Sequence, residues 1–498
     1  MSISIPSQIL AWLAQKQLFA LNSHYQQITK QNLPIIVVTG TVGKSSTTLL
    51  ISQYLQANGY QVVTGTSEQK NLNTLTGVVM SLAGIYIEFA NTNRFQKFLA
   101  WSKLLSFGVF SSMFPRLEIN QDMAIVMEVG YDFQGESAIY KKIFERIDLL
   151  VVTATTWEHN QGFNKVVDST RISALKDFLP DSWVKNLDNG LIDSRLRNIA
   201  IEQVNLCSQA EYIVLPEKIG EITNTLLTNS INSDQTIQKL QSIDSVSLAK
   251  PKFLVSTAES SRINGILCSD KLVYNSKYLL PKSFARTSLV LQCVANCFEL
   301  EGDLIAPTLQ NCILPYGRFG YFNGLNQTKI VDSTYNSDPS SLGYFLDTLE
   351  EVINSGQEFG QPTGHTLILG EMRELGNVAK VEHCKILDRL IDLETKYPEQ
   401  IINIYLIGQE WSNCGDSDSS SWFVNYSGKQ FKRYATAGGI SKELTKNEIK
   451  PQSWFWVKGS QNTIFLEIVV EALLANSEDK KYLCRQEPKW ESIKSNLK

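Results

Sequence analysis

The sequence lacks several features that would indicate a particular class of protein. It has no basic tract, no nucleic-acid recognition motif, no C-x-x-C pair and no N-terminal signal peptide. With a net charge of −4, it gives no indication of a nucleic-acid partner. The eight cysteines are scattered, and Cys293 and Cys297, in an apolar helical stretch, are expected to be buried thiols rather than a metal site. We therefore expect a protein of the reducing cytoplasm.

The bulk composition is that of a globular protein with more than one domain. Hydrophobic residues make up 43% and charged residues 19% of the chain, which is ordinary for globular domains. A length of 498 residues is enough for two to three domains. No internal repeat is evident, so function must be inferred from local motifs.

The strongest motif lies near the N-terminus. Five apolar or β-branched residues lead into Gly40-Thr-Val-Gly-Lys-Ser45, and a helix-compatible segment follows over 47–57. A glycine turn between a buried strand and a helix forms an anion cradle, in which Lys44 adds a cation and Ser45 a hydroxyl for Mg²⁺. Val38 stands where the eight-residue nucleotide motif begins with glycine, so this is the shorter form of the motif. Its position favours phosphate binding over a plain turn.

Two further predicted strands end beside this loop. Segment 122–129 contains Glu128 near its end, and segment 147–154 is followed shortly by His159. In open α/β sheets, ligands collect at the carboxyl ends of the strands. We therefore expect Glu128 and His159 to serve a metal ion or a phosphate, the alternative being that each is a structural residue.

Two other segments are predicted to be helical. Residues 97–114 are apolar and aromatic but include Lys97 and Lys103, so a membrane span is not expected. The favoured interpretation is an amphipathic helix packed on the core, and the alternative is peripheral contact with a membrane or a partner protein. Residues 1–33 contain one or two amphipathic helical segments. We assign no chemistry to residues 208–252.

The C-terminal part repeats the alternation of strand and helix. This pattern predicts a second parallel α/β domain. The predicted fold class is α/β, with a P-loop central domain that contains a parallel-rich sheet, followed by a Rossmann-like C-terminal α/β domain. Predicted strands lie at 329–332, 366–369, 401–407 and 453–457, with helices at 379–396 and from 464. The predicted limits are 1–33 for a short helical extension, 34–315 for the central domain and 316–498 for the C-terminal domain.

Several stretches together resemble the Mur ligases, the ATP-dependent amide-bond-forming enzymes of peptidoglycan synthesis, and most of all the MurF branch. MurF joins D-alanyl-D-alanine to UDP-N-acetylmuramoyl-tripeptide. The matching blocks occur in the family's order over roughly 34–475. They are Gly40–Thr47, Lys70-Asn-Leu-Asn73, Glu128-Val-Gly130 with Gly135-Glu136, His159, Asn186-Leu-Asp188, Gly317-Arg318, Asp332-Ser-Thr-Tyr-Asn-Ser-Asp-Pro339, Gly370-Glu-Met-Arg-Glu-Leu-Gly376 with His383, and Lys458-Gly-Ser460.

The resemblance implies a reaction and a set of site residues. ATP phosphorylates a substrate carboxylate to an acyl phosphate, an amine attacks, and ADP and phosphate leave. ATP and Mg²⁺ are the implied cofactors, a small-molecule acid and an amine are the implied substrates, and two domains are expected to close over the cleft. The implied catalytic residues are Lys44, His159 and Arg318; the nucleotide-binding residues are Gly40, Thr41, Gly43, Lys44, Ser45, Ser46, Asn73, Arg318, Asp332, Tyr335 and Asn336; the Mg²⁺ ligands are Ser45 and Glu128 for the first ion and His159 for the second. Among these, Arg318 neutralises the transferred phosphoryl group, Asp332 holds the ribose, and Tyr335 and Asn336 line the nucleotide cleft.

The sequence departs from the family in four places. Only 33 residues precede the first strand, so we expect the N-terminal UDP-sugar domain to be missing. No lysine stands at the place of the carbamylated lysine that serves the second metal, since Arg171 cannot be carbamylated in the same way and Lys176 lies beyond that place. Ser283-Phe-Ala-Arg-Thr287 replaces the adenine-side H-N motif, and 97–114 resembles an insertion.

These departures leave the substrate open. The leading hypothesis is a MurF-type ligase that adds a dipeptide or amino acid to a cell-wall precursor. One alternative is an amide ligase of a specialised pathway with a non-UDP substrate. The runner-up from a different class is a non-catalytic nucleotide-binding paralogue or subunit. Whether a partner protein supplies the acceptor site is left open. A simple P-loop ATPase or GTPase ranks after the ligase and the paralogue, because the C-terminal blocks would then have no role.

Overall fold

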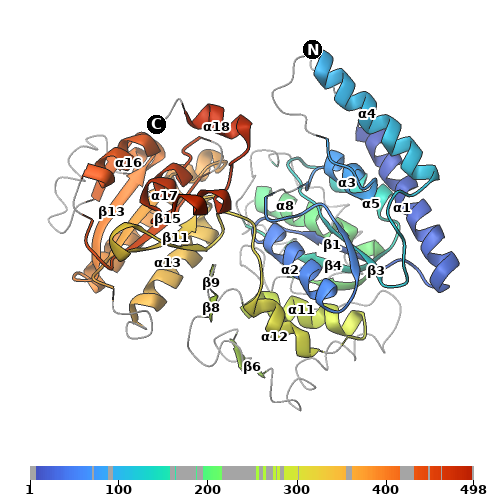
Figure 1. Cartoon of the computed structure of the whole chain (residues 1–498), viewed down its shortest axis with the longest axis horizontal. Helices are drawn as coiled ribbons and strands as arrows, with labels where there is room; N and C mark the ends of the chain where they lie inside the picture. The colour runs from blue at the N-terminus through green and yellow to red at the C-terminus, as the bar shows by residue number, and fades with distance from the viewer. Residues whose placement is uncertain are drawn as a thin grey trace. The chain divides into compact units, whose positions relative to one another are not determined.

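The computed structural model describes most of the chain (Figure 1). The described residues are 7–69, 72–87, 94–156, 163, 187, 194–215, 254–256, 262–264, 273–275, 278–280, 285–300, 302–354, 362–414, 431–446, 449–460 and 463–495.

The chain forms two compact units. Unit 1 comprises Met1–Ile266 and Ala285–Ile313, and unit 2 comprises Leu267–Phe284 and Leu314–Lys498. Leu267–Phe284 groups with unit 2 because its two short strands join the sheet of that unit.

Unit 1 is built on a five-stranded sheet in which every pairing is parallel. Its strand order is β2-β3-β1-β4-β5. The central strands are continuous runs of aliphatic residues because helices cover both faces of a parallel sheet. The strands are β1 (Ile35–Thr39), β2 (Gln61–Thr64), β3 (Met123–Glu128), β4 (Ile147–Val152) and β5 (Ala210–Val214), and β6 (Leu254–Ser256) and β7 (Arg262–Asn264) form a separate antiparallel pair.

The helices of unit 1 pack around this sheet. Helices α11 and α12 contact α2, and α1 contacts α3, α4 and α5. The α1 side chains Leu10, Leu13 and Leu21 are buried in the same apolar core as the sheet. The helices are α1 (Ser7–Thr29), α2 (Lys44–Ala57), α3 (Leu75–Leu82), α4 (Arg94–Met113), α5 (Ser137–Ile143), α8 (Ser194–Val204), α11 (Ala285–Cys297) and α12 (Ile305–Gln310).

Unit 2 contains a mixed sheet of eight strands. The order is β14-β13-β12-β15-β11-β10-β9-β8. Pairings from β14 to β11 are parallel, and those from β11 to β8 are antiparallel. The strands are β8 (Val273–Asn275), β9 (Tyr278–Leu280), β10 (Gly320–Asn323), β11 (Lys329–Ser333), β12 (His365–Gly370), β13 (Ile401–Ile407), β14 (Phe431–Tyr434) and β15 (Trp454–Lys458), and the helices are α13 (Pro339–Asn354), α14 (Ala379–Lys396), α16 (Ala437–Lys446), α17 (Glu467–Leu473) and α18 (Pro488–Lys494).

The predicted fold class is confirmed, because both units are α/β and rich in parallel pairings. Among the cysteines, Cys293 is a buried free thiol and Cys297 is half-buried. Within the described ranges, no helix combines the length and the apolar content that a bilayer span requires.

Candidate functional site

The glycine turn before α2 has the geometry of a phosphate-binding loop. Gly40 and Gly43 have φ angles of 132° and 88°, which residues with a side chain rarely adopt. A Cβ atom on Gly40 would lie 2.2 Å from Thr153 Oγ1, so this position has no room for a side chain. The N–H groups of the first turn of α2 have no acceptor inside the helix, and the helix dipole adds positive potential. The turn therefore favours an anion.

The carboxyl end of β4 holds this loop in place. Thr41 N–H donates to Ala154 O at 2.9 Å, and the Thr153 hydroxyl donates to Val42 O at 2.6 Å. Thr156 N–H donates to Thr41 Oγ1 at 2.9 Å. Because β1 and β4 are adjacent parallel strands, the sheet brings the two strand ends together and rigidifies the loop.

Glu128 is a nearly fully buried carboxylate at the end of β3, with 2% of its surface exposed. The Ser45 hydroxyl donates to Glu128 Oε1 at 3.2 Å, and Asn73 Nδ2 donates to the same oxygen at 3.4 Å. The Thr66 hydroxyl donates to Glu128 Oε2 at 3.2 Å. The structure thus brings together Ser45, Asn73 and Glu128, three residues that the resemblance placed at one site.

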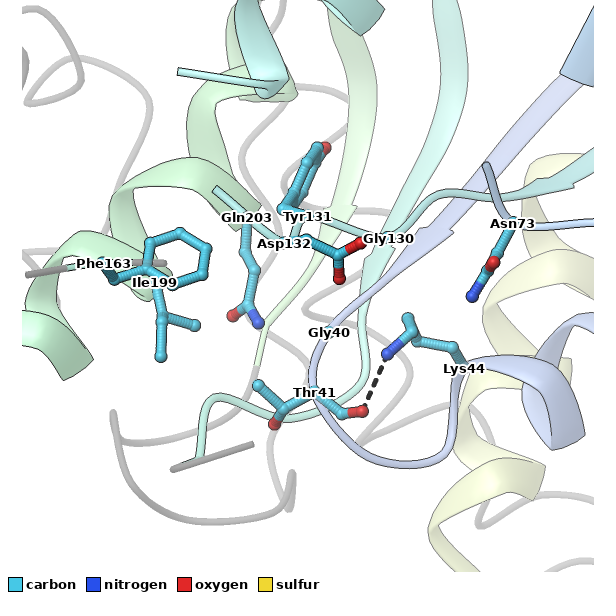
Figure 2. A pocket seen from close by; sticks show the side chains of 10 residues that line it. All are labelled: Gly40, Thr41, Lys44, Asn73, Gly130, Tyr131, Asp132, Phe163, Ile199 and Gln203. Carbon is cyan, nitrogen blue, oxygen red and sulfur yellow. Dashed lines mark hydrogen bonds between the residues drawn. The ribbon is translucent and has the colours of Figure 1, made fainter. Parts of the chain in front are cut away.

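A cavity of about 210 Å³ opens beside the loop. Lys44 Nζ donates to Thr41 O at 2.8 Å, and Figure 2 shows Lys44, Asn73 and Asp132 around the same space. Drug-sized ligands occupy pockets of about 300–1,000 Å³, so this cavity has room for phosphate groups rather than a whole nucleotide. Its lining residues are Gly40, Thr41, Lys44, Asn73, Gly130, Tyr131, Asp132, Phe163, Ile199 and Gln203.

Two glutamates order the loop that follows β3. Glu136 Oε2 accepts from Asp132 N–H at 2.6 Å. Glu202, fully buried on α8, accepts from Gly135 N–H at 2.7 Å and from Ser137 N–H at 3.0 Å. These bonds fix the backbone of Asp132 at the cavity wall.

In unit 2, Asp332 is fully buried on β11. Its Oδ1 accepts from the Thr334 N–H at 2.9 Å and from the Thr334 hydroxyl at 2.6 Å. Its Oδ2 has no hydrogen-bond partner among the described residues. Burial raises the pKa of Asp332 to about 6, although Thr334, Arg485 and Lys458 lower it. A buried acceptor without a donor is costly unless a ligand or water supplies one.

Three more of the predicted site residues, Arg318, Tyr335 and Asn336, lie close to Asp332 in unit 2. Two guanidinium groups lie over the faces of the Tyr335 ring, with the Arg318 and Arg485 Cζ atoms 4.7 Å and 5.4 Å from its centroid. Tyr335 N–H donates to Gly317 O at 3.1 Å, and a Cβ on Gly317 would lie 2.9 Å from Tyr335 N. Lys458 Nζ donates to Asn336 O. Unit 2 therefore places three of the blocks side by side, namely Gly317-Arg318, Asp332–Pro339 and Lys458–Ser460.

The block Gly370–Gly376 has a structural explanation. Met372 N–H donates to His383 Nε2 at 2.9 Å, and His383 Nδ1–H donates to Ala379 O at 2.7 Å. The His383 ring is fully buried and packs edge-on against the Trp411 ring, with the ring centroids 4.6 Å apart. Burial lowers the pKa of His383. A neutral His383 thus fixes the chain that follows β12, and Glu371 accepts from Glu410 N–H at 3.0 Å in the same corner.

Some of the predicted residues cannot be placed. His159, Arg171 and Lys176 lie outside the described residues, as do Lys70 and Asn71. Ser46 is described and half-buried at the start of α2. Among the described residues, no group of three or more His, Cys, Asp or Glu side chains is placed to hold a metal ion.

Sequence reasoning missed several residues of these sites. Asp132 follows the end of a strand, so the expectation that ligands bind at the carboxyl ends of strands could also have identified Asp132. Gln203 and Glu202 on α8, and Arg485 near the C-terminus, belong to no motif. Arg485 also pairs with the buried Glu467 at 3.2 Å. Glu202 reaches Ser137 across 65 residues of chain and Arg485 reaches Thr334 across 151 residues, and no local pattern encodes such contacts.

The two units with these sites define a Mur-ligase-type fold. The structure is similar to that of MurF from Acinetobacter baumannii, with a TM-score of 0.55 and 15% sequence identity over 93% of this chain and 80% of that chain. It is also similar to the UDP-N-acetylmuramoylalanyl-D-glutamyl-2,6-diaminopimelate–D-alanyl-D-alanyl ligase from Acinetobacter baumannii, with a TM-score of 0.51 and 14% identity over 92% of this chain and 78% of that chain. The resemblance to MurF is therefore confirmed at the level of the fold.

Sequence comparison adds no assignment of its own. No protein-family model matches the chain, and no curated protein matches it.

Proposed function

We propose that the chain is an ATP-dependent ligase that joins a carboxylate to an amine through an acyl phosphate. The observation that carries the proposal is the glycine loop of unit 1 with Ser45 and the buried Glu128 at its base. The Mur-ligase-type fold supports it by analogy, since one fold can host several functions.

The residues at the loop fit a hard divalent cation. Ser45 Oγ and Glu128 Oε1 lie 3.2 Å apart, and Mg²⁺ is held by one or two such oxygens together with phosphates and waters. Burying a carboxylate is costly, and hydroxyl and amide donors offset that cost less fully than a cation does. Ser45 and Glu128 would therefore hold Mg²⁺, which when bound neutralises charge on the nucleotide phosphates.

The side chains around the loop would bind and orient ATP. Lys44 and the N–H groups at the start of α2 would hold the β- and γ-phosphates, because phosphoryl transfer needs positive charge on the phosphate oxygens more than covalent help. The γ-phosphoryl group passes to a carboxylate oxygen of the acid, and ADP leaves. The amine nitrogen then attacks the acyl carbon and phosphate leaves. Arg318 has, by resemblance, the task of neutralising the transferred group.

Asp332 suits the role of a ribose ligand. Its buried Oδ2 has no hydrogen-bond partner among the described residues, and a ribose hydroxyl would supply the missing donor. Thr334 already fixes the other carboxylate oxygen, so the orientation of Oδ2 is set before a ligand binds.

For the finer specificity, we favour the MurF type, in which a dipeptide or amino acid is added to a cell-wall precursor. Of the two similar solved structures, one is named MurF and the other is named as a D-alanyl-D-alanyl ligase. A non-UDP acid of a specialised pathway is the alternative. A non-catalytic nucleotide-binding paralogue is a second candidate, because no lysine stands at the place expected for the carbamylated lysine.

Nucleotide binding tests the site directly. Calorimetric titration with ATP and Mg²⁺ should show binding to the wild type, a loss of roughly tenfold or more in Lys44→Ala, and a weakened Mg²⁺ dependence in Ser45→Ala. Ser52→Ala is the matched control, because Ser52 lies on the same helix and donates to Thr48 O at 2.8 Å. Equal ATP affinity in all four proteins would remove the site assignment.

A further inference from the structure

Helices α1 and α4 form a parallel pair on the surface of unit 1. Gln17 Nε2 donates to the buried Ser111 hydroxyl at 2.7 Å, and a Cβ on Gly108 would lie 3.2 Å from Leu13 Cδ1. The two contacts advance in the same direction along both helices, so the helices run in the same direction, and Figure 1 shows them side by side. Gly108 thus lets the helices approach closely.

The outer faces of this pair are unusually apolar. Of the fifteen large hydrophobic residues that are exposed in the described parts of the chain, ten lie on α1 or within residues 98–114. Such a concentration marks a binding surface, whereas isolated exposed hydrophobic residues are ordinary. The ten are Ile9, Trp12, Phe19 and Ile28 on α1, and Phe98, Leu99, Val109, Phe110, Met113 and Phe114 on α4 and just after it.

The α4 residues recur at helical spacing on one side of the helix, in two groups with the exposed Lys103 and Ser106 between them. Phe98 and Leu99 form the first group, and Phe110, Met113 and Phe114 end the second with 51%, 57% and 62% of their surfaces exposed. The Phe110 and Phe114 rings contact each other, with centroids 5.5 Å apart. We call the six exposed hydrophobic residues within 98–114 the aromatic stripe.

The charge of the pair is of one sign. Residues 1–67 and 89–117 contain no Asp or Glu, although the whole chain has a net charge of −4. Lys16 lies on α1, and Lys97, Lys103 and Arg116 lie along the aromatic stripe or just beyond it. Glu145 is a neighbouring carboxylate, and it accepts from Gln15 Nε2 at 2.7 Å.

Two of these cations lie over an aromatic ring of α4. Arg116 lies 4.8 Å and Lys103 6.0 Å from the centroid of Phe107. Trp101 and Phe107 are half-buried, and Trp101 packs on the core. The residues available to a partner are therefore the aromatic stripe and its flanking basic side chains.

We propose that the aromatic stripe binds the surface of an anionic lipid bilayer, with α4 lying in the interface rather than crossing it. A helix with aromatic and aliphatic residues on one side and lysines beside them, without acidic residues, has the chemistry of an interfacial anchor. Lys97 and Lys103 can extend their ammonium groups to lipid phosphates while their stems stay on the apolar surface.

A second copy of the chain is a poorer fit to this surface. A two-fold contact brings the same patch of both copies together, so Lys97 and Lys103 would meet like charges with no carboxylate on the stripe to pair them. An anionic bilayer satisfies both the apolar and the basic side chains. This inference is independent of the proposed ligase activity.

Vesicle co-sedimentation of the full chain tests the proposal. We expect binding to vesicles of phosphatidylcholine mixed with phosphatidylglycerol, and much weaker binding to phosphatidylcholine alone or at high salt. The triple variant Phe110→Ser, Met113→Ser, Phe114→Ser should lose roughly tenfold or more of the binding. The matched control is Leu325→Ser, Val381→Ser, Ile493→Ser, three exposed apolar residues of unit 2, which should bind like the wild type. Lys97→Glu with Lys103→Glu should weaken binding to the anionic vesicles selectively.

Three results would overturn the proposal. The first is wild-type protein that stays in the supernatant with anionic vesicles, and the second is a triple variant that sediments as well as the wild type. The third is a wild-type dimer in light scattering while the triple variant is a monomer, since a second copy would then cover the stripe. An unchanged circular dichroism spectrum confirms that each variant is folded.

Discussion

Asp332→Asn should change the way in which the stability of unit 2 depends on pH. The asparagine keeps the Oδ1 acceptor for the Thr334 N–H and hydroxyl but carries no charge. In the wild type, burial raises the pKa of Asp332 from 3.8 to about 6. The folded state therefore binds this proton more tightly than the unfolded state between these two values.

The sign and size of the effect follow from this shift. A raised pKa gives a stabilising contribution that is complete below the unfolded value near 3.8 and is lost as the pH rises through about 6. A shift of about two units corresponds to about 3 kcal/mol. The free energy of unfolding of the wild type, relative to that of Asp332→Asn, should thus fall by about 3 kcal/mol between pH values of about 3.5 and 7.

Native-state hydrogen exchange of the β11 peptide measures this difference, with rates corrected for the intrinsic effect of pH. The wild type and the variant are compared at each pH, so contributions from other groups cancel. If the difference in free energy of unfolding between the two proteins is the same at every pH tested, the argument that a charged Asp332 is costly in the folded state is refuted. If Oδ2 binds the ribose, the same variant should also bind ATP more weakly at neutral pH.

Three further variants test the other contacts. Gly40→Ala should abolish ATP binding, because its Cβ would lie 2.2 Å from Thr153 Oγ1; Gly59→Ala is the control, having φ 89° but open space around it, and equal affinities in titration would contradict the packing argument. Arg318→Ala should lower turnover more than it lowers ATP affinity, and equal losses would count against a role in the transition state. His383→Ala should lower the free energy of unfolding by about 3 kcal/mol, since Met372 N–H and Ala379 O lose their partners; a loss below about 1 kcal/mol in denaturant titration would show that water replaces the ring.

Much of the fold was predictable because the central strands are buried on both faces. Runs such as Ile35–Thr39 and Met123–Glu128 are apolar up to their last residue, and the prediction for Ile401–Ile407 matches the structure. The short strands β8, β9 and β10 were not predicted. Each has only three or four residues, and antiparallel pairing at the side of a parallel sheet leaves no long periodic signal.

The residues of the candidate site likewise fall into those that local sequence predicts and those that it does not. The glycine loop is local in sequence, and Glu128 stands at a strand end, so both were predicted. The contacts made by Glu202 and Arg485 depend on tertiary packing, and sequence patterns did not reveal them. The helix of 97–114 was predicted, but the side that faces outward was not: Trp101 and Phe107 are half-buried, whereas Phe110 and Phe114 are exposed.

Product formation tests the central claim most directly. The protein is incubated with ATP, Mg²⁺, UDP-N-acetylmuramoyl-tripeptide and D-alanyl-D-alanine, with Lys44→Ala as the control, and ADP and the ligated mass are measured. We predict ADP release that requires both the acid and the amine, together with a product of the mass expected for one amide bond. ADP release that is the same with and without the two substrates, or bound ATP with neither ADP nor product, would contradict MurF-type ligation.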